Sequence, residues 1–247
     1  MRASAIEFRL RMAINAAIII LGFWAPWIEP WGIGRRMTLL EWLSLELGRT
    51  GWMRFTVAVP IWIAVAAAIA ALGAALRIWG TACLGTDTVT SLDMKAGTIV
   101  ADGPFRYLRN PLYLGLWCMV AAMSFIMPVT GALFAMVLIS VFLMRLILAE
   151  EAFLSARIGE PYTLYTRAVP RIVPRLRSPL PRAQGRPRWL RAVFAELTPV
   201  GVFVTLAFLS WSYDSRLMAR AILIFFGASL VVRAFMPANA DPHQRAA

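Results

Sequence analysis

One polar segment, residues 103–115, combines the residue types that bind an anion. Its sequence is GPFRYLRNPLYLG, in which Asn110 followed by Pro111 is the pattern of a helix N-cap and a first helical residue. The start of a helix presents unpaired backbone N–H groups and a partial positive charge, and Arg106 and Arg109 come just before it. The segment therefore predicts a site for a carboxylate or a phosphate, although each feature alone also fits an ordinary membrane helix.

Two adjacent acids, Glu150 and Glu151, follow a long apolar run and predict a site for a positive charge. Carboxylates are unfavourable at the C-terminal end of a helix, because that end already carries the negative pole of the helix dipole. We expect compensation from the arginines of residues 103–115, from Arg145 or from a cationic ligand. Arg145 lies five residues before Glu150, which is not the spacing of neighbours on one helix face. Its side chain could instead extend to the membrane interface.

A third polar segment, residues 159–174, has the sequence GEPYTLYTRAVPRIVP and places Tyr162 and Tyr165 on one helical face. Two tyrosines in this pattern are typical of the aromatic belt at a membrane interface. Beside an anion site and a pair of acids they also predict aromatic walls for a ligand. Together the three segments favour a ligand that carries both signs of charge.

The composition excludes several classes of function. Of the 247 residues, 60% are hydrophobic and 15% are charged, and the mean hydropathy is +0.68, which indicates a membrane protein rather than a soluble domain. The net charge of +12 falls between apolar runs rather than on a polar scaffold, so we expect no nucleic-acid partner. His243 is the only histidine, and Cys83 and Cys118 are isolated, so no metal site is expected.

The apolar runs that must position these segments predict an all-α fold, a polytopic bundle of about six transmembrane helices. A spanning helix needs about 20 mostly apolar residues. Six stretches qualify approximately, at residues 11–29, 55–77, 111–128, 130–148, 193–212 and 217–236. Thr38 and Glu41 form a capping box ahead of leucines that share one face, which predicts one further helix at the membrane interface.

The positions of the basic residues predict the orientation of the bundle, because short cytoplasmic loops are enriched in Lys and Arg. With the N-terminus inside, nine arginines between residues 157 and 191 are cytoplasmic. Arginines in the first outside loop weigh against this orientation; they are Arg35, Arg36, Arg49 and Arg54. The short turn near residues 128–131 joins two spans as a hairpin, so the polar segments emerge on the same side. We therefore expect an integral membrane protein with a cytoplasmic active face.

The order of these segments resembles the isoprenylcysteine carboxyl methyltransferase family, its bacterial relatives and the related membrane phospholipid methyltransferases. The resemblance to the bacterial relatives implies a location in the bacterial inner membrane. The resemblance covers approximately residues 72–176, with GPFRYLRNPLYLG, a tight hairpin and then EEAFLSARIGEPYTLYTRAVPRIVP. It implies transfer of a methyl group from S-adenosylmethionine to a substrate reached from the membrane, with the cofactor at the cytoplasmic ends of the core helices. The core is preceded by an N-terminal part, residues 1–71. It is followed by a linker rich in Pro and Arg, residues 177–192, and by a C-terminal pair of spans with a tail, residues 193–247.

Matching positions carry the site residues of this family over to the chain. The cofactor-binding candidates implied by the resemblance are Gly103, Tyr107, Asn110, Pro111, Tyr113, Gly115, Glu150, Tyr162 and Tyr165. Arg109 and Glu151 are the catalytic candidates, with Arg109 facing the carboxylate of the cofactor and Glu151 acting as the base if the acceptor is an amine. The best-known members have histidine where this chain has Asn110, and asparagine can bond a carboxylate or cap a helix but cannot exchange protons.

Two other functions are compatible with the same segments. A membrane reductase of the sterol type would bind NADPH, whose additional phosphates two carboxylates would repel. A non-enzymatic scaffold or transporter would use the polar segments only as interfacial anchors. For a methyltransferase the acceptor is left open, since a lipophilic substrate or a small thiol, carboxylate or amine would each fit. The expected partners are the lipid bilayer, this acceptor and a second copy bound through the C-terminal spans.

Overall fold

The computed structural model describes residues 2–24, 37–84, 101–178, 180, 187–212 and 214–235. Within these ranges every regular element is a helix, and one isolated β-bridge joins Thr38 to Pro128. The all-α prediction is confirmed for this part of the chain. Arg35, Arg36, residues 179 and 181–186 of the predicted linker and the tail that contains His243 lie outside the described residues.

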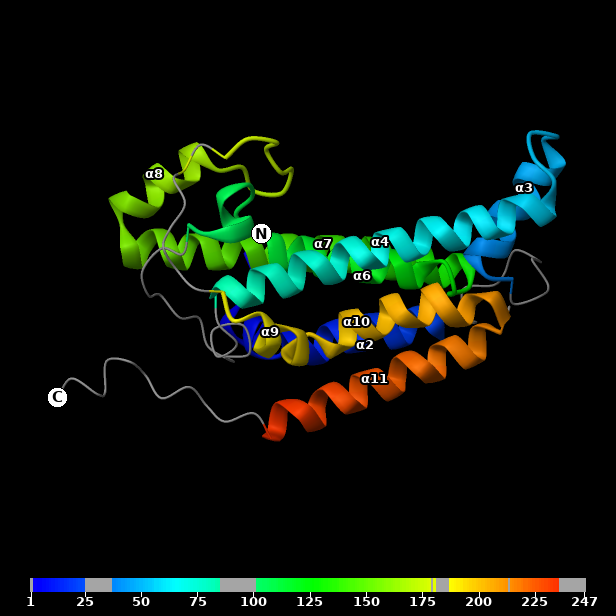
Figure 1. Cartoon of the computed structure of the whole chain (residues 1–247). Helices are drawn as coiled ribbons and strands as arrows, with labels where there is room; N and C mark the ends of the chain where they lie inside the picture. The colour runs from blue at the N-terminus through cyan, green and yellow to red at the C-terminus, as the bar shows by residue number, and fades with distance from the viewer. Residues whose placement is uncertain are drawn as a thin grey trace.

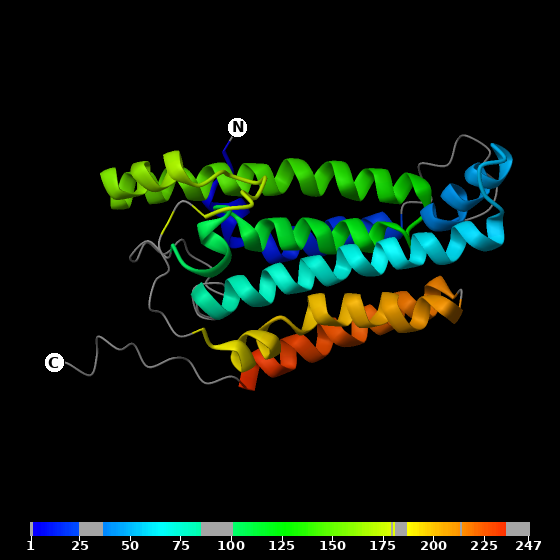
Figure 2. The ribbon, with the colours of Figure 1, turned by 45° about the horizontal axis from the view of Figure 1, so that its top comes forward.

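The long helices lie side by side and alternate in direction along the chain (Figure 1, Figure 2). They are α2 (Arg11–Phe23), α4 (Phe55–Leu84), α6 (Pro111–Ser124), α7 (Val129–Ile158), α10 (Leu197–Val204) and α11 (Ser215–Phe235). The short helix α1 (Ala5–Arg9) precedes α2, and α10 continues through η3 (Thr205–Leu209) and η4 (Ser210–Ser212). Each long helix contributes buried apolar side chains to one core. The bundle is therefore held together by burial of one apolar face of each helix.

The six complete spans that we expected are not confirmed. Among the described residues two helices, α4 and α7, are long and apolar enough to cross a membrane, and each has 30 residues. The number of candidate spans rises to three only if α9 (Trp189–Ala195) and the helix that follows it are counted as one span with a bend of 72° between them. The apolar helices α2 and α6 have 13 and 14 residues, fewer than the about 20 that a span needs. Helix α6 is shorter than its apolar run because the apolar residues after Ser124 form the turn into α7.

The helix that follows the predicted capping box covers this turn. In α3 (Leu39–Arg49) the Thr38 hydroxyl accepts from the Glu41 backbone N–H at 3.3 Å, and the Thr38 backbone N–H donates to the Glu41 carboxylate at 2.8 Å, so the capping box is confirmed. The backbone N–H groups of Leu39 and Leu40 donate to carbonyls of the α6–α7 turn at 2.9 and 3.0 Å. This helix therefore fixes the hairpin at the end of the bundle opposite the polar segments (Figure 1).

Two glycines let α4 and α6 approach each other closely. A Cβ atom placed on Gly115 would lie 2.6 Å from Cγ of Arg77 and 2.9 Å from the backbone oxygen of Gly73. Such distances are below van der Waals contact, so a larger residue at either glycine would push the two helices apart. Gly115, predicted to bind the cofactor, therefore lies in the contact between α4 and α6.

The polar segments lie together at one end of the bundle. Figure 1 and Figure 2 show η2 (Gly103–Arg106) and α8 (Glu160–Ala168) beside the start of α6 and the end of α7. The start of α1 and the ends of α4 and α11 lie at the same end of the molecule. The prediction that the hairpin brings the polar segments to the same side is therefore confirmed.

Candidate active site

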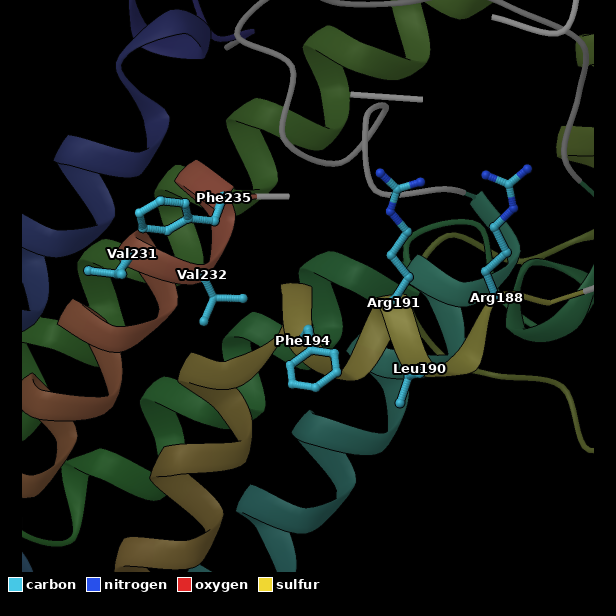
Figure 3. Close-up of a pocket in the computed structure, with 7 residues that line it drawn as sticks. All are labelled: Arg188, Leu190, Arg191, Phe194, Val231, Val232 and Phe235. Carbon is cyan, nitrogen blue, oxygen red and sulfur yellow. The ribbon is translucent and has the colours of Figure 1, made fainter. Parts of the chain in front are cut away.

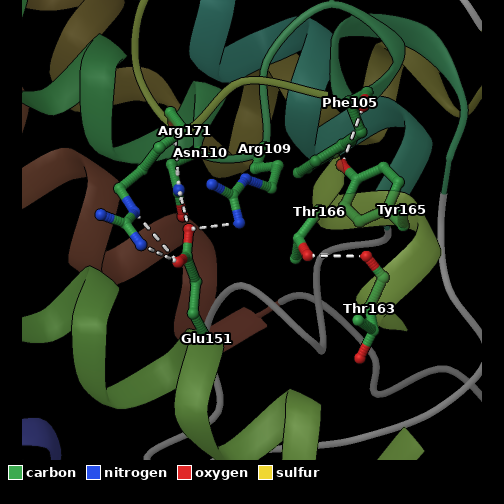
Figure 4. A network of polar contacts seen from close by, with 8 residues as sticks. All are labelled: Phe105, Arg109, Asn110, Glu151, Thr163, Tyr165, Thr166 and Arg171. Carbon is green, nitrogen blue, oxygen red and sulfur yellow. Dashed lines mark hydrogen bonds and ion pairs between the residues drawn. The ribbon is translucent and has the colours of Figure 1, made fainter. Parts of the chain in front are cut away.

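The centre of the polar end is the carboxylate of Glu151, which is 8% exposed. One of its oxygens accepts from Nδ2 of Asn110 at 3.1 Å and lies 3.4 Å from Nη1 of Arg109 (Figure 4). The other accepts from Nε and Nη2 of Arg171 at 3.0 and 2.8 Å. Hydrogen bonding to this carboxylate raises the pKa of Arg171. The charge of Glu151 is therefore compensated by two arginines, one of which, Arg171, was not predicted.

The segment after α8 lies against the segment before α6. The Arg109 backbone N–H donates to the Pro170 carbonyl at 2.9 Å, and the Arg175 backbone N–H donates to the Tyr107 carbonyl at 3.0 Å. Val169 is extended, as a residue before proline must be, so α8 ends there and the chain turns back toward α6. This turn places the Arg171 side chain beside the Glu151 carboxylate. The sequence signal that could have predicted this contact is the arginine directly after Pro170.

Asn110 occupies the position before the first turn of α6, but its side chain does not cap the helix. Pro111 is the first helical residue, as predicted. The Asn110 amide donates instead to Glu151 and to the Arg171 carbonyl, the latter at 3.1 Å, and no side chain of the described residues caps α6. The prediction of a side-chain cap is therefore wrong: the amide group is held by the two bonds that its Nδ2 donates, and its oxygen accepts from no backbone N–H at the start of α6.

Unused hydrogen-bond donors remain beside this helix start. The buried Nε atom of Arg109 has no hydrogen-bond partner among the described residues. A buried donor without a partner costs free energy, so such an atom usually marks a place for a further acceptor. Together with the uncapped first turn of α6, this donor is compatible with the anion site predicted for the segment, and anion binding itself stays a prediction.

The neighbouring acid, Glu150, faces a different part of the bundle. Its carboxylate accepts from the Tyr113 hydroxyl at 2.8 Å, and the guanidinium of Arg11 in α2 is a nearby positive charge. Successive residues of a helix point about 100° apart, and the two carboxylates accordingly have different hydrogen-bond partners. The paired acids therefore form two separate sites, and Arg11 is a contribution from the N-terminal part that was not predicted.

Arg145 compensates neither of these acids. Its Nη2 atom lies 2.9 and 2.8 Å from the two carboxylate oxygens of Glu7 in α1, and the Ala3 backbone N–H donates to the Arg145 carbonyl at 3.1 Å. Of the groups expected to compensate the paired acids, Arg145 is therefore not the one, because it pairs with Glu7 instead. It fastens the N-terminal segment onto α7.

The two predicted tyrosines pack inward from α8. The Tyr165 hydroxyl donates to the Phe105 carbonyl at 2.8 Å (Figure 4). The ring centres of Tyr162 and Tyr165 are 5.9 Å apart. They form a small apolar cluster with Val169. This cluster joins α8 to η2 and forms one wall of the polar end.

Gly103 and Tyr107 lie against the end of α4. The Tyr107 ring is 6.1 Å from the Trp79 ring, centre to centre. Gly103 has φ of +54°, and a Cβ there would lie 2.8 Å from Nε1 of Trp79, so only glycine fits. Both residues anchor η2, and their role in cofactor binding stays a prediction, as it does for the other candidates.

A second buried ion pair, not predicted, ties the C-terminal helices to the start of α6. Nε and Nη2 of Arg77 donate to the two oxygens of Glu196 at 2.7 and 3.0 Å, and the Thr81 hydroxyl donates to Glu196 at 2.7 Å. Nη1 of Arg77 donates to the Leu112 carbonyl in the first turn of α6 at 3.2 Å. Glu196 has no exposed surface and lies where α9 bends into α10.

The tyrosines are expected to stay neutral during any reaction near neutral pH. Burial and then the charge of Glu151 raise the pKa of Tyr162 to about 12, and burial raises that of Tyr165. Because the folded pKa lies above the unfolded value of about 10, the contribution of Tyr162 to stability is complete below pH 10. It is lost as the pH rises toward about 12.

Titration of tyrosine absorbance near 295 nm in detergent checks this expectation. The difference between the natural protein and the Tyr162→Phe variant isolates one phenol, which we expect to ionise near pH 12 while circular dichroism still reports a folded chain. A midpoint near the ordinary tyrosine value of about 10 would contradict the buried position of Tyr162.

Comparison with known proteins gives two matches, one to a family and one to a curated protein. A family model described as phospholipid methyltransferase matches residues 61–160. The protein-S-isoprenylcysteine O-methyltransferase of Schizosaccharomyces pombe is 35% identical over 88 residues, which are 35% of this chain and 37% of that protein. The aligned part thus spans little more than a third of the relative. No solved structure matches the chain.

The family match contains most of the site built from the residues above. It includes Arg109, Asn110, Glu150 and Glu151, whereas α8 from Pro161 onward and Arg171 follow it. The resemblance that we inferred over residues 72–176 is supported by both matches, with a family-matched segment that starts and ends earlier. Residues 61–160 of this chain are therefore similar to the phospholipid methyltransferase family, and part of the chain is similar to an isoprenylcysteine O-methyltransferase.

Proposed function

We propose that this protein is an integral-membrane methyltransferase that uses S-adenosylmethionine. The observation that carries the proposal is the buried, unpartnered Nε atom of Arg109 beside the uncapped start of α6, inside the family-matched segment. This arrangement suits a carboxylate, which S-adenosylmethionine has in its methionine part. A membrane scaffold has no need of a buried donor held in this way.

The positive part of the cofactor is assigned to Glu150 rather than to Glu151. Both oxygens of Glu151 already accept hydrogen bonds from Asn110 and Arg171, and Arg109 adds a second guanidinium. Glu150 accepts from the neutral Tyr113 hydroxyl and has the Arg11 guanidinium as a nearby charge, so it is less fully engaged than Glu151 and better placed to attract an ammonium or a sulfonium. Tyr162 and Tyr165 would cover the same end from α8 and exclude water.

When bound, S-adenosylmethionine supplies a methyl group on a positively charged sulfur. In the transfer the acceptor atom forms a bond to the methyl carbon while the carbon–sulfur bond breaks and its electrons return to sulfur. The protein contributes by holding the acceptor in line and by keeping the site dry. Glu151 is assigned to holding Arg171 and Asn110 rather than to proton transfer, because its oxygens are already engaged. A thiolate or carboxylate acceptor would need no base.

The membrane placement follows from the same proposal. We infer that the polar end faces the cytoplasm of a bacterial cell and that the acceptor is lipophilic or a small thiol, carboxylate or amine. The basic residues between 157 and 191 support the orientation. A methyl-labelled cofactor, incubated with the protein and membrane extract, would identify the acceptor through the labelled product.

Ligand-dependent stabilisation tests the proposed cofactor. We expect S-adenosylmethionine and its demethylated product each to stabilise the purified protein in detergent, by about 2.7 kcal/mol at about one hundred times Kd. NADPH at the same concentration should leave the melting temperature unchanged. Stabilisation by NADPH alone would favour the sterol-type reductase, and stabilisation by none of the three would favour a scaffold or transporter.

A further inference from the structure

A return segment, residues 169–178, lies beside the part of the chain that leads into α6. Near its beginning the Arg109 backbone N–H donates to the Pro170 carbonyl at 2.9 Å, and at its end the Ser178 hydroxyl donates to the Arg106 carbonyl at 3.3 Å. The apolar helix α6 begins at Pro111, shortly after Arg109. The return segment is therefore fixed at the level where the chain enters the apolar bundle, which in a membrane is the headgroup interface.

The middle of the return segment exposes two large apolar side chains. Val173 is 77% exposed and Leu176 is 98% exposed, although the hydrogen bonds at both ends hold the segment in place. Single exposed apolar residues are common on protein surfaces. Here two of them are held beside a membrane boundary, where entry into the lipid interface would remove their surface from water.

The same part of the return segment is strongly basic. Arg175 and Arg177 flank Leu176, and both are exposed. Within the described part of the chain neither guanidinium has a hydrogen bond or an ion pair. The sequence contains no acidic residue between Glu160 and Glu196, whereas arginines recur throughout this stretch. Uncompensated positive charge around exposed apolar side chains is the complement of an anionic lipid surface.

Another exposed apolar surface of the bundle lacks this combination. Figure 3 shows a groove between α9 and the end of α11, whose lining includes Phe194, Val231 and Phe235. The side chains of Arg188 and Arg191 extend away from these apolar residues. The groove therefore selects no charge in an occupant, whereas the return segment presents apolar and cationic side chains next to each other.

We propose that the return segment binds the anionic lipid surface of the surrounding membrane. Val173 and Leu176 enter the interfacial layer of the bilayer, and Arg175 and Arg177 pair with lipid phosphates. Arginine suits this task because its planar guanidinium presents a fork of donors to a phosphate, and each basic residue near an anionic leaflet adds to the attraction. The partner is a negatively charged lipid surface, not a single lipid enclosed in a pocket.

The inner side of the same segment holds the candidate active site. Arg171 donates to Glu151 at 2.8 Å, and the Pro170 carbonyl accepts from Arg109. Lipid that fixes the outer side of the segment also restricts these inner contacts, so the ordering of the site is partly completed before the cofactor binds. This consequence rests on the proposed function, and it makes the affinity for the cofactor depend on the charge of the membrane.

A fluorescent label tests the lipid contact without any cofactor. Leu176→Cys, in a chain that also has Cys83→Ser and Cys118→Ser, is labelled and placed in nanodiscs whose lipid includes phosphatidylcholine with a quencher close to its headgroup. We expect quenching that increases when phosphatidylglycerol replaces part of the phosphatidylcholine. The matched position is Leu164→Cys, at an exposed leucine of α8, which should show little quenching in either lipid. Equal quenching at the two positions would overturn the proposal.

Paired arginine variants of the labelled chain test the role of charge. Arg175→Gln with Arg177→Gln should abolish the increase in quenching that phosphatidylglycerol causes. Arg157→Gln with Arg167→Gln changes the net charge equally at two exposed arginines of α7 and α8 and should retain it. An equal loss in both pairs would show a diffuse attraction of the whole protein and would overturn the assignment to the return segment. Size-exclusion chromatography checks that each variant is folded.

Calorimetric titration in the same two nanodiscs tests the link to the site. The ligand is the demethylated product of S-adenosylmethionine, because it lacks the sulfonium charge that an anionic bilayer would concentrate. We expect the natural protein to bind it about fivefold more tightly with phosphatidylglycerol, at the lower end of usual coupling between sites. Val173→Ser with Leu176→Ser should remove this difference, and Leu164→Ser should keep it.

The two measurements fail separately. Equal affinity in both lipids would overturn the link between the membrane and the site. If neither the product nor S-adenosylmethionine binds in either lipid, the proposed function is wrong, and the quenching at residue 176 still decides whether the return segment binds the anionic surface.

Discussion

Replacing Glu151 with alanine is expected to lower the free energy of unfolding by about 3 kcal/mol and to remove the stabilisation by S-adenosylmethionine. The change takes away the acceptor of Asn110 and the partner of Arg109 and Arg171, so two guanidinium groups lose their compensating charge. The Arg109 side chain is only 12% exposed, but that of Arg171 is 41% exposed and can be solvated when Glu151 is removed. The loss of unfolding free energy is therefore expected near the lower end of the range for breaking a buried ion pair. Denaturant titration in detergent measures the stability.

Two further variants separate the charge of Glu151 from its shape. Glu151→Gln keeps an acceptor for Asn110 but loses the charge, and we expect an intermediate loss of stability. Glu160→Ala, at an exposed acid of α8, is the matched control and should behave as the natural protein. Calorimetric titration with S-adenosylmethionine well below the melting temperature then reports binding independently of folding. Unchanged binding in Glu151→Ala would rule out our assignment of Glu151 as the anchor of the site.

Glu196→Ala is expected to lower the free energy of unfolding by about 3–5 kcal/mol, as much as Glu151→Ala or more. The carboxylate is fully buried, so its removal leaves the Arg77 guanidinium, with a side chain only 14% exposed, without its charged partner. Arg77 also donates to the Leu112 carbonyl, so the first turn of α6 should shift as well. We therefore expect weaker binding of S-adenosylmethionine in addition to the loss of stability, although Glu196 lies outside the family-matched segment.

A double variant and a surface control complete this test. Arg77→Met combined with Glu196→Met removes both charges, and replacing a buried pair by apolar residues often restores stability. Glu46→Ala breaks the exposed ion pair with Arg49 at 3.0 Å and should cost less than about 1 kcal/mol. If Glu196→Ala is no less stable than Glu46→Ala, the C-terminal helices are not fastened to the bundle through this pair.

Local features of the fold could be predicted from the sequence because residues a few positions apart decide them. Thr38 and Glu41 form the capping box, and Pro111 begins α6. Tyr162 and Tyr165 share the inner face of α8. In each case the interacting groups lie within one helical turn, so tertiary contacts do not alter the result.

Span lengths were less predictable, since hydropathy measures how long an apolar run is and not where its backbone turns. Phe125 to Met127 are as apolar as the helix before them, yet they bond to α3 and form the turn into α7. The run that predicted a span therefore yields an α6 of 14 residues. Only the position of α3 against the hairpin decides this boundary.

The sequence by itself determined that the charged residues gather at the ends of apolar helices and that Glu150 and Glu151 need compensation. The tertiary structure alone decided the partners. Glu7 and Arg145 meet across 138 positions of sequence, and Arg77 and Glu196 across 119. A charge attracts any opposite charge that comes near it, so spacing along the chain cannot select among 25 basic residues. The packing of the helices makes that selection, and it divides two adjacent acids between two different sites.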